Sequence, residues 1–225
     1  MEIKTHSIGE AIELALYTLN QYGVVEDREN QDREDQCKEI RLGIEIVNPQ
    51  SEPYISKAIP CGLDGLNKYI REFLVGEGDE LDWTYTYHKL YSPFYEKVLE
   101  ELRRNKNSRR ACIALGQGSI NFTAYPPCLQ LLNFSCRGNL LDLTCYFRSN
   151  DGVKAFPMNV IAIAELQKKV AEDLNLEIGT LYYFANNFHA YSKDWKLLES
   201  YCKIFETGDY NRRFYSKADL KGELN

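Results

Sequence analysis

Apolar residues recur three and four positions apart in five stretches of the chain, a spacing that predicts helices. The first covers 7–22, where Ser7 and Glu10 have the spacing of a capping box and Gly23 follows the last apolar position. The same spacing predicts the other four helices at 63–75, 93–105, 158–176 and 192–205.

Other stretches have the short apolar or alternating patterns of strands, and they lie at 40–47, 110–115, 128–136, 140–148 and 179–191. Arg137-Gly138-Asn139 is a turn signal, so the third and fourth of these strands are expected to form a hairpin. Residues 26–39 are rich in charge without a periodic apolar face, which predicts an exposed loop. Helices and strands do not alternate regularly, so the predicted fold class is α+β, in a single domain over 1–225.

Composition narrows the classes of function. The chain has 27 Lys and Arg against 33 Asp and Glu, so its net charge of −6 gives no general attraction for a nucleic acid polymer. The N-terminal segment is too charged for a secretory signal, and no apolar run is long enough to span a membrane. Seven cysteines without a C-x-x-C pair indicate reduced thiols in a cytoplasmic protein and no metal site.

Cys128 is a candidate nucleophile. A free cysteine is most often a buried structural residue. Here, however, Pro126-Pro127 fixes the backbone just before it, and Arg109, Arg110 and Arg148 would lower the pKa of its thiol if the fold brings them close. A thiolate is the species that adds to an electron-poor carbon.

Other polar residues have both a structural and a ligand-binding interpretation. Arginines at strand ends, such as Arg109-Arg110 and Arg148 beside Ser149, either face solvent or clamp a phosphate.

Asn159 is either an ordinary helix-start residue or an amide that matches the O4 and N3–H edge of uracil. His189 and Tyr191 are two apart on a strand and therefore share a face, where they either pack in the core or hold a sugar hydroxyl.

Five short motifs from 108 to 191 resemble those of the thymidylate synthase family in order and interval, and a weaker match covers 69–91. The motifs are SRR (108–110), PPC (126–128), RSND (148–151), PMN (157–159) and FHAY (188–191). The resemblance implies a large mixed sheet flanked by helices, packed sheet to sheet in a homodimer. It also implies methylation of dUMP to dTMP with 5,10-methylenetetrahydrofolate or another methylene-tetrahydropterin.

The resemblance further implies roles for individual residues. Those near the reacting carbon are Cys128 as nucleophile, Tyr87 for removal of the C5 proton, Glu72 for ordering water and Asp151 near the pterin ring. Those that bind the nucleotide are Arg148 and Ser149 for phosphate, Arg109 and Arg110 for the partner's phosphate, Asn159 for uracil, and His189 and Tyr191 for ribose. A further phosphate arginine is expected in the first charged loop, where Arg28 and Arg33 both fit.

The sequence also departs from the family pattern. Leu129 replaces the usual histidine after the cysteine, His88 replaces a glycine, and Glu72 is out of register. The tail at 214–225 does not resemble the folate-closing C-terminus, and the pattern is closer to compact, divergent archaeal and phage members. Two alternatives therefore stay open: a hydroxymethylase acting on dUMP, with dCMP disfavoured by Asn159, and a non-catalytic nucleotide-binding homologue.

Overall fold

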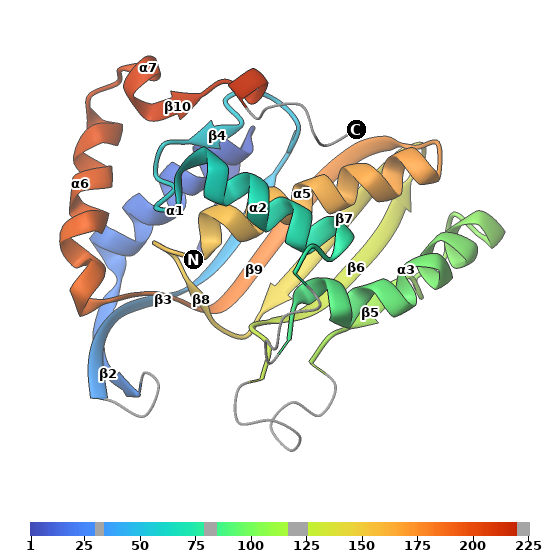
Figure 1. Cartoon of the computed structure of the whole chain (residues 1–225), viewed down its shortest axis with the longest axis horizontal. Coiled ribbons are helices and arrows are strands. Elements are labelled where there is room, and N and C mark those ends of the chain that lie inside the picture. The colour runs from blue at the N-terminus through green and yellow to red at the C-terminus, as the bar shows by residue number, and fades with distance from the viewer. Residues whose placement is uncertain (30–33, 79–84, 117–125, 220–225) are drawn as a thin grey trace.

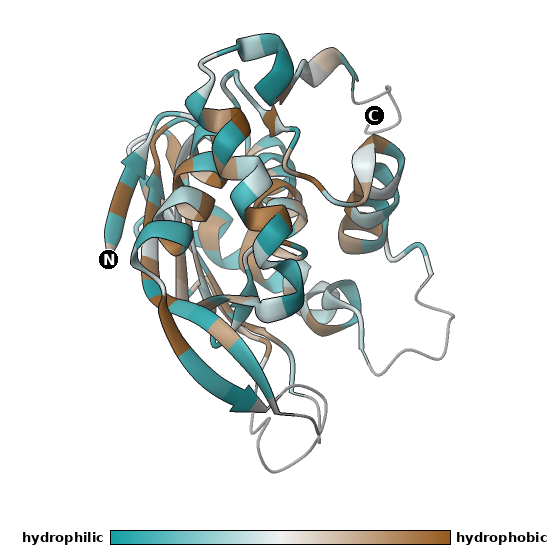
Figure 2. Cartoon of the chain, turned by 90° about the vertical axis from the view of Figure 1, so that its left-hand side faces the viewer, coloured by the Kyte–Doolittle hydropathy of each residue, from teal (hydrophilic) through white to brown (hydrophobic). Residues whose placement is uncertain are grey.

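The chain folds as a large mixed sheet with helices over one face (Figures 1 and 2). A computed structural model of the chain describes residues 1–29, 34–78, 85–116 and 126–219. Within these ranges the sheet has eight strands in the order β1-β3-β9-β7-β6-β5, with β2 paired to β3 and β8 paired to β9. β1 with β3, β7 with β9, and β8 with β9 are parallel, and the other pairs are antiparallel. The predicted α+β class with a large mixed sheet is confirmed.

The strands of this sheet are β1 (Glu2–Thr5), β2 (Val24–Glu29), β3 (Glu34–Ile46), β5 (Cys112–Ala114), β6 (Leu129–Arg137), β7 (Leu140–Phe147), β8 (Asn150–Asp151) and β9 (Glu177–Tyr191). The helices are α1 (Ile8–Tyr22), α2 (Gly62–Val75), α3 (Tyr87–Arg104), α5 (Phe156–Asp173), α6 (Trp195–Glu206) and α7 (Tyr210–Arg213). A small second sheet joins β4 (Ile55–Ser56) to β10 (Phe214–Tyr215).

The core lies between the inner face of the sheet and α5. Phe134, Phe147 and Tyr183 point inward from β6, β7 and β9 and are fully buried, each stabilising the fold by roughly 2 kcal/mol or more. Helix α5 is buried along most of its length because α2 covers its other side (Figure 1). This double cover holds the first turn of α5, which carries Asn159, in a fixed position above the sheet.

Local sequence signals account for most helix ends. Ser7 Oγ accepts from the Glu10 amide at 3.3 Å and Glu10 Oε2 accepts from the Ser7 amide at 3.2 Å, so the predicted capping box is confirmed. The third predicted helix begins at Tyr87 rather than at residue 93. Thr86 Oγ1 accepts from the Lys89 amide at 3.2 Å and caps the helix there, and Pro93 lies inside it at the loss of one backbone hydrogen bond.

The prediction of a loop at 26–39 is wrong over the described residues of that stretch. There, β2 and the first half of β3 form an antiparallel ribbon. Residues 24–28 of β2 are exposed to water, and most of the ribbon residues are hydrophilic (Figure 2), so the sequence has no alternation of apolar and polar residues. Polar pairs across the strands replace an apolar face: Arg28 pairs with Glu39, and Gln36 donates to Asp27 at 3.3 Å.

The outer face of the sheet carries a partly exposed aromatic pair. Tyr146 on β7 and Phe184 on β9 are direct neighbours, and their rings stack with centroids 5.7 Å apart and planes inclined by 19°. Thr144 and Tyr182 form the next pair along the same face. The helices lie on the opposite side of the sheet in Figure 2, so they leave this outer sheet face uncovered.

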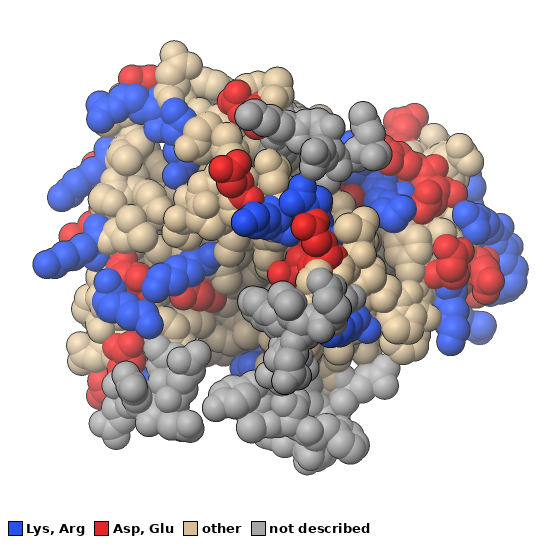
Figure 3. Space-filling view, in the orientation of Figure 1, with Lys and Arg blue, Asp and Glu red and all other residues tan. Residues whose placement is uncertain are grey.

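Basic and acidic side chains are interspersed over the face of the molecule shown in Figure 3. Among the described residues, no helix has both the length and the apolar content needed to cross a membrane.

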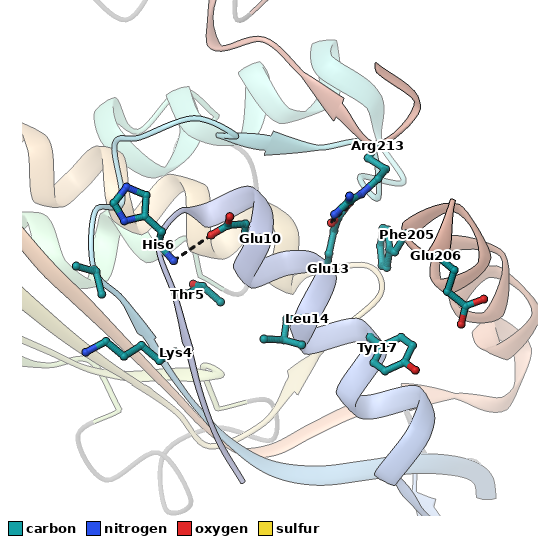
Figure 4. A pocket seen from close by; sticks show the side chains of 11 residues that line it. Lys4, Thr5, His6, Glu10, Glu13, Leu14, Tyr17, Phe205, Glu206 and Arg213 are labelled. Carbon is teal, nitrogen blue, oxygen red and sulfur yellow. Dashed lines mark hydrogen bonds and ion pairs between the residues drawn. The ribbon is translucent and has the colours of Figure 1, made fainter. Parts of the chain in front are cut away.

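A partly buried ion pair ties α7 to α1 (Figure 4). Glu13 is only 5% exposed, and Arg213 Nε donates to its two carboxylate oxygens at 3.1 and 3.2 Å. Burial raises the pKa of Glu13, and the hydrogen bonds and charge of Arg213 oppose that rise.

Replacing Arg213 with alanine should lower the free energy of unfolding by about 2 kcal/mol near neutral pH, because it leaves a buried carboxylate unpaired. The raised pKa of Glu13 means that the fold favours its protonated form, so this loss should be smaller at about pH 5 than at about pH 8. Urea unfolding of the wild type and of Arg213→Ala at the two pH values measures this loss of unfolding free energy.

Lys4→Ala is the matched control, because Lys4 and Glu45 form an exposed pair with side chains 65% and 40% accessible. Its removal should cost less than about 1 kcal/mol. Equal losses in the two variants, or a loss in R213A that is the same at both pH values, would contradict the structural interpretation of Glu13.

Candidate functional site

A tight hairpin places Cys128 beside Arg148. Gly138 and Asn139 form the turn between β6 and β7, and Gly138 has a φ of +64°, which glycine adopts without strain. The pairing runs from Arg137 opposite Leu140 to Leu129 opposite Phe147. One step beyond, the Arg148 amide donates to the Cys128 carbonyl at 2.9 Å.

The Arg148 side chain holds the turn before the cysteine and also faces the thiol. Its Nε donates to the Pro127 carbonyl at 3.1 Å and its Nη2 donates to the Pro126 carbonyl at 2.6 Å. The same Nη2 lies 3.8 Å from Cys128 Sγ. Because the prolines fix their own φ angles, these bonds leave the backbone before the half-buried thiol little freedom.

Burial and charge act in opposite directions on the Cys128 thiol. Burial raises its pKa, the Arg148 charge lowers it by less, and the net pKa is therefore raised. The expectation that arginines lower the pKa holds for Arg148 alone among the described residues. Arg109 and Arg110 are exposed in the segment before β5 and do not line the pocket described below.

Three tyrosines gather near the thiol. Tyr87 Oη accepts from the Leu129 amide at 3.3 Å, and the Tyr85 and Tyr87 rings lie 5.7 Å apart. Burial raises the pKa of Tyr69, Tyr85 and Tyr87, so all three present neutral phenols. Only Tyr87 was predicted as a site residue. The alternation of Tyr85 and Tyr87 along the chain was the one signal for Tyr85, and Tyr69 had none apart from its helical spacing.

Asn159 joins this group from the first turn of α5. The residue is 4% exposed; its Oδ1 accepts from Tyr69 Oη, and its Nδ2 donates to Asn150 Oδ1 at 3.4 Å. An amide has a second lone pair and a second N–H, so it keeps capacity for a ligand. That Asn159 reads uracil stays a prediction.

A pocket of about 290 Å³ lies on the other side of Arg148. It brings together five residues predicted to bind nucleotide, namely Arg28, Arg148, Ser149, His189 and Tyr191. Cys37, Glu39 and Asn187 complete its wall. Of the two candidate loop arginines, Arg28 lines the pocket, and Arg33 lies outside the described residues.

His189 has an unused nitrogen in this pocket. Its Nδ1 lies 3.4 Å from Ser149 Oγ and 3.2 Å from the Asn187 carbonyl, whereas its buried Nε2 has no hydrogen-bond partner among the described residues. The Tyr191 ring stands beside it with centroids 4.8 Å apart, so the predicted shared face is confirmed. A buried polar atom without a partner is rare in proteins and marks a place where a ligand can donate or accept.

The remaining predicted residues lie close to the site without lining this pocket. Asp151 is opposite His189 in the β8–β9 register, and its Oδ1 accepts from the amides of Val153 and Lys154, both at 2.9 Å. Glu72 lies one turn after Tyr69 on α2, and its charge raises the pKa of Tyr69. Glu72 is therefore within electrostatic reach of Tyr69.

A larger pocket, of about 690 Å³, lies between α1 and α6 (Figure 4). Glu13 and Arg213 point toward one another in its wall, and Tyr17 and Phe205 are among its apolar lining residues. None of the residues predicted for catalysis or nucleotide binding lines it. The predicted nucleotide-binding residues that line a pocket therefore line the smaller one.

The fold and the site define an α+β protein with a half-buried thiol next to a pocket suited to an anionic ligand. Residues 85–205, more than half of the chain, match the family profile described as thymidylate synthase. The chain belongs to the thymidylate synthase family.

Individual relatives extend this match. A protein of Methanocaldococcus jannaschii, provisionally named a thymidylate synthase, is 28% identical over 214 residues, which cover 88% of this chain and 95% of that protein. One of Methanopyrus kandleri with the same provisional name is 37% identical over 165 residues, 70% of this chain and 78% of its own. The thymidylate synthase of Vesicomyosocius okutanii is 30% identical over 104 residues, 46% of this chain and 39% of its own. The first relative shows that the similarity reaches well beyond 85–205.

Replacing Arg148 with glutamine should raise the pKa of Cys128 further, because the charge that opposes burial is removed. Less thiolate is then present at any given pH, so alkylation of Cys128 by iodoacetamide should slow several-fold and its pH midpoint should move upward. Mass spectrometry of the peptide containing Cys128, after timed labelling across a pH series, measures both.

Arg137→Gln is the control, because Arg137 lies at the turn end of the same hairpin and pairs with Asp142 at 2.6 Å. Its Cys128 labelling should match that of the wild type, and labelling of the exposed Cys112 should be the same in all three proteins. Unchanged Cys128 labelling in R148Q would show that Arg148 has no effect on the thiol.

Proposed function

We propose that this protein methylates dUMP at C5 to give dTMP, with a methylene-tetrahydropterin as the one-carbon donor. The observation that carries the proposal is the 3.8 Å approach of Arg148 to the Cys128 thiol at the edge of a pocket of about 290 Å³. Family membership supports one-carbon transfer as the reaction class. The choice between a methyl and a hydroxymethyl product rests on the test below.

In the proposed reaction, Cys128 Sγ bonds to C6 of uracil as the thiol loses its proton, and the C5–C6 π electrons move to C5 and O4. C5 then bonds to the one-carbon unit and loses its proton, and the bond between that carbon and the pterin nitrogen breaks. A hydride completes the methyl group as the Sγ–C6 bond ruptures, sulfur regains a proton, and the pterin would leave as the dihydro form. When bound, the methylene-tetrahydropterin supplies the one-carbon unit and the hydride that completes the methyl group. The rings of Tyr85 and Tyr87, inclined by 51° to each other, offer aromatic faces on which a pterin could pack.

The pocket residues would bind the nucleotide through separate groups. Arg28, Arg148 and Ser149 supply donors for the phosphate, and the unpartnered Nε2 of His189, with Tyr191, suits the ribose. Phosphate binding energy then holds the base against the thiol, which turns a bimolecular addition into a unimolecular one.

The groups nearer the thiol would act on the base. Asn159 would read the uracil edge, and its neighbours Tyr69 and Asn150 fix its amide. Tyr87, with water ordered by Glu72, would carry away the C5 proton, and Asp151 would lie near the pterin.

Incubating the protein with dUMP and methylenetetrahydrofolate should give dTMP, identified by its mass. Replacing dUMP by 5-fluoro-dUMP should trap a covalent adduct on Cys128, because fluorine at C5 cannot leave as a proton does. Cys128→Ser should abolish the adduct and lower turnover at least about a thousandfold.

Each alternative has its own result in this assay. Hydroxymethyl-dUMP without dTMP would make the protein a hydroxymethylase. Formation of hydroxymethyl-dCMP when dCMP replaces dUMP in the assay would make cytosine its base. Nucleotide binding without product or adduct would leave a non-catalytic homologue. Cys112→Ser, which removes an exposed thiol on β5, is the matched control and should retain full activity.

We further propose that two copies pack through the outer sheet face, whose Tyr146–Phe184 stack is partly exposed. In this arrangement, the exposed Arg109 and Arg110 of each subunit would bind the phosphate in the pocket of the partner subunit.

Complementation tests that arrangement. Cys128→Ser dimers and Arg109→Ala/Arg110→Ala dimers should each be nearly inactive. After the two are dissociated and reassociated together, about one quarter of the wild-type activity should return, because half of the dimers are mixed and each mixed dimer has one intact site. No recovery, despite mixed dimers seen by native mass spectrometry, would contradict arginines that act across the interface.

A further inference from the structure

A carboxylate lies among the groups proposed to bind the nucleotide phosphate. Glu39 on β3 is directly opposite His189 on β9, and its side chain is 15% exposed. It lines the same pocket as Arg28 and Arg148. A fixed negative charge opposes the binding of an anion, so its presence in this pocket requires a physical account.

Arg28 binds Glu39 through one edge of its guanidinium group. Its Nε donates to Oε2 at 3.0 Å and its Nη2 donates to Oε1 at 2.5 Å, while Asn187 Nδ2 donates to Oε1 at 3.5 Å. The Arg28 hydrogen bonds lower the pKa of Glu39, so the group is a carboxylate at neutral pH. Arginine has five N–H donors, so three donors on Nη1 and Nη2 are left for a ligand.

The strand register alone does not bring Arg28 to Glu39. Asp35 is directly opposite Arg28 on the ribbon, whereas Glu39 is opposite Val24, four residues earlier on β2. The Arg28 and Glu39 side chains therefore extend along the same face of the ribbon to meet. Asp35 accepts from Ser192 Oγ at 2.8 Å instead. Glu39 thus directs Arg28 toward the pocket.

Glu39 has two opposite effects on phosphate binding, and its orienting effect is the larger. Arg28 projects from the exposed strand β2, and its side chain is 49% exposed. If a ligand had to fix this side chain by itself, the lost rotamer freedom would weaken binding by up to about 30-fold. A single opposing charge about 7 Å away in a partly solvated pocket weakens binding by only about three- to eightfold.

We propose that Glu39 is a positioning residue, which holds Arg28 with the remaining donors of its guanidinium group facing a phosphate in this pocket. This inference rests on the proposed function, since it takes the ligand of the pocket to be the nucleotide phosphate. Arg148 and the partner subunit's Arg109 and Arg110 would bind the phosphate without help from Glu39. Removal of Glu39 therefore weakens binding in part, by the loss of one preorganised cation.

The test is a double-mutant cycle on dUMP binding, measured by calorimetry at fixed ionic strength. Glu39→Gln removes the charge that holds Arg28, so the dissociation constant of dUMP should rise about three- to tenfold. In an Arg28→Ala background there is no side chain to position, and the same change removes only a repulsion. There the dissociation constant should fall about three- to eightfold.

The signs of the two changes separate this role from two simpler ones. Tighter dUMP binding by E39Q in both backgrounds would show that Glu39 only opposes the phosphate. Weaker binding in both would show that Glu39 supports the pocket independently of Arg28. Either result would overturn the proposal.

Steady-state kinetics provide a second readout. Because positioning acts on binding before the chemical step, KM for dUMP should rise in E39Q while kcat stays nearly the same. A fall in kcat with unchanged KM would count against the positioning role.

Asp27→Asn is the matched control, because Asp27 is the exposed neighbour of Arg28 on β2, accepts from Gln36 at 3.3 Å and does not line the pocket. It removes a carboxylate from the same ribbon, so its dissociation constant for dUMP should stay within about twofold of the wild-type value. A rise equal to that in E39Q would contradict a specific role of Glu39.

Inorganic phosphate, as a second ligand in the same cycle, separates this role from the proposed function. If phosphate binds and shows the two opposite signs while dUMP does not bind, the positioning role stands and the proposed function is wrong. If the wild type methylates dUMP and neither ligand shows opposite signs, the proposed function stands and the positioning role is wrong. If neither ligand binds, both are wrong.

Discussion

The site depends on the register of one hairpin. The hydrogen bond from the Arg148 amide to the Cys128 carbonyl ends a ladder that begins at the Gly138-Asn139 turn. A shift of one residue would move the Arg148 side chain to the opposite face of the sheet. It would then lose the carbonyls of Pro126 and Pro127, and the thiol would lose its only described cation. A turn some ten residues away thus decides the chemistry of the cysteine.

The thiol environment combines two opposing effects, and their balance suits a nucleophile that must not react before its substrate arrives. Burial keeps Cys128 protonated, while Arg148 stays close enough to stabilise the thiolate once the proton leaves. The neutral phenols of Tyr85 and Tyr87 add polarity without charge. In the proposed reaction, addition to a bound base would shift negative charge away from sulfur onto the ring, where preorganised donors are more effective than water.

The parts of the fold and of the site that could be predicted from the sequence are those encoded by residues close together in the chain. The capping box of α1, the glycine after α2 and the β6–β7 turn are encoded within a few residues, and the helices and strands around them were found. The β2–β3 ribbon was missed because pairs such as Arg28 with Glu39, eleven residues apart, replace an apolar face. The tyrosines at 69 and 85 were missed for a related reason: only tertiary packing brings them to the thiol.

The ribbon and the hairpin meet because β9 lies between β3 and β7. Neighbouring strands are about 4.8 Å apart, so the backbones that carry Arg28 on β2 and Arg148 after β7 are separated by roughly 14 Å across β3 and β9. Two guanidinium groups that extend from either side of that gap can meet on one phosphate, above the His189 side chain of the central strand. Glu39 enters from the β3 side and fixes the direction of Arg28. The width of the sheet therefore sets the spacing from which the two guanidinium groups converge on the pocket.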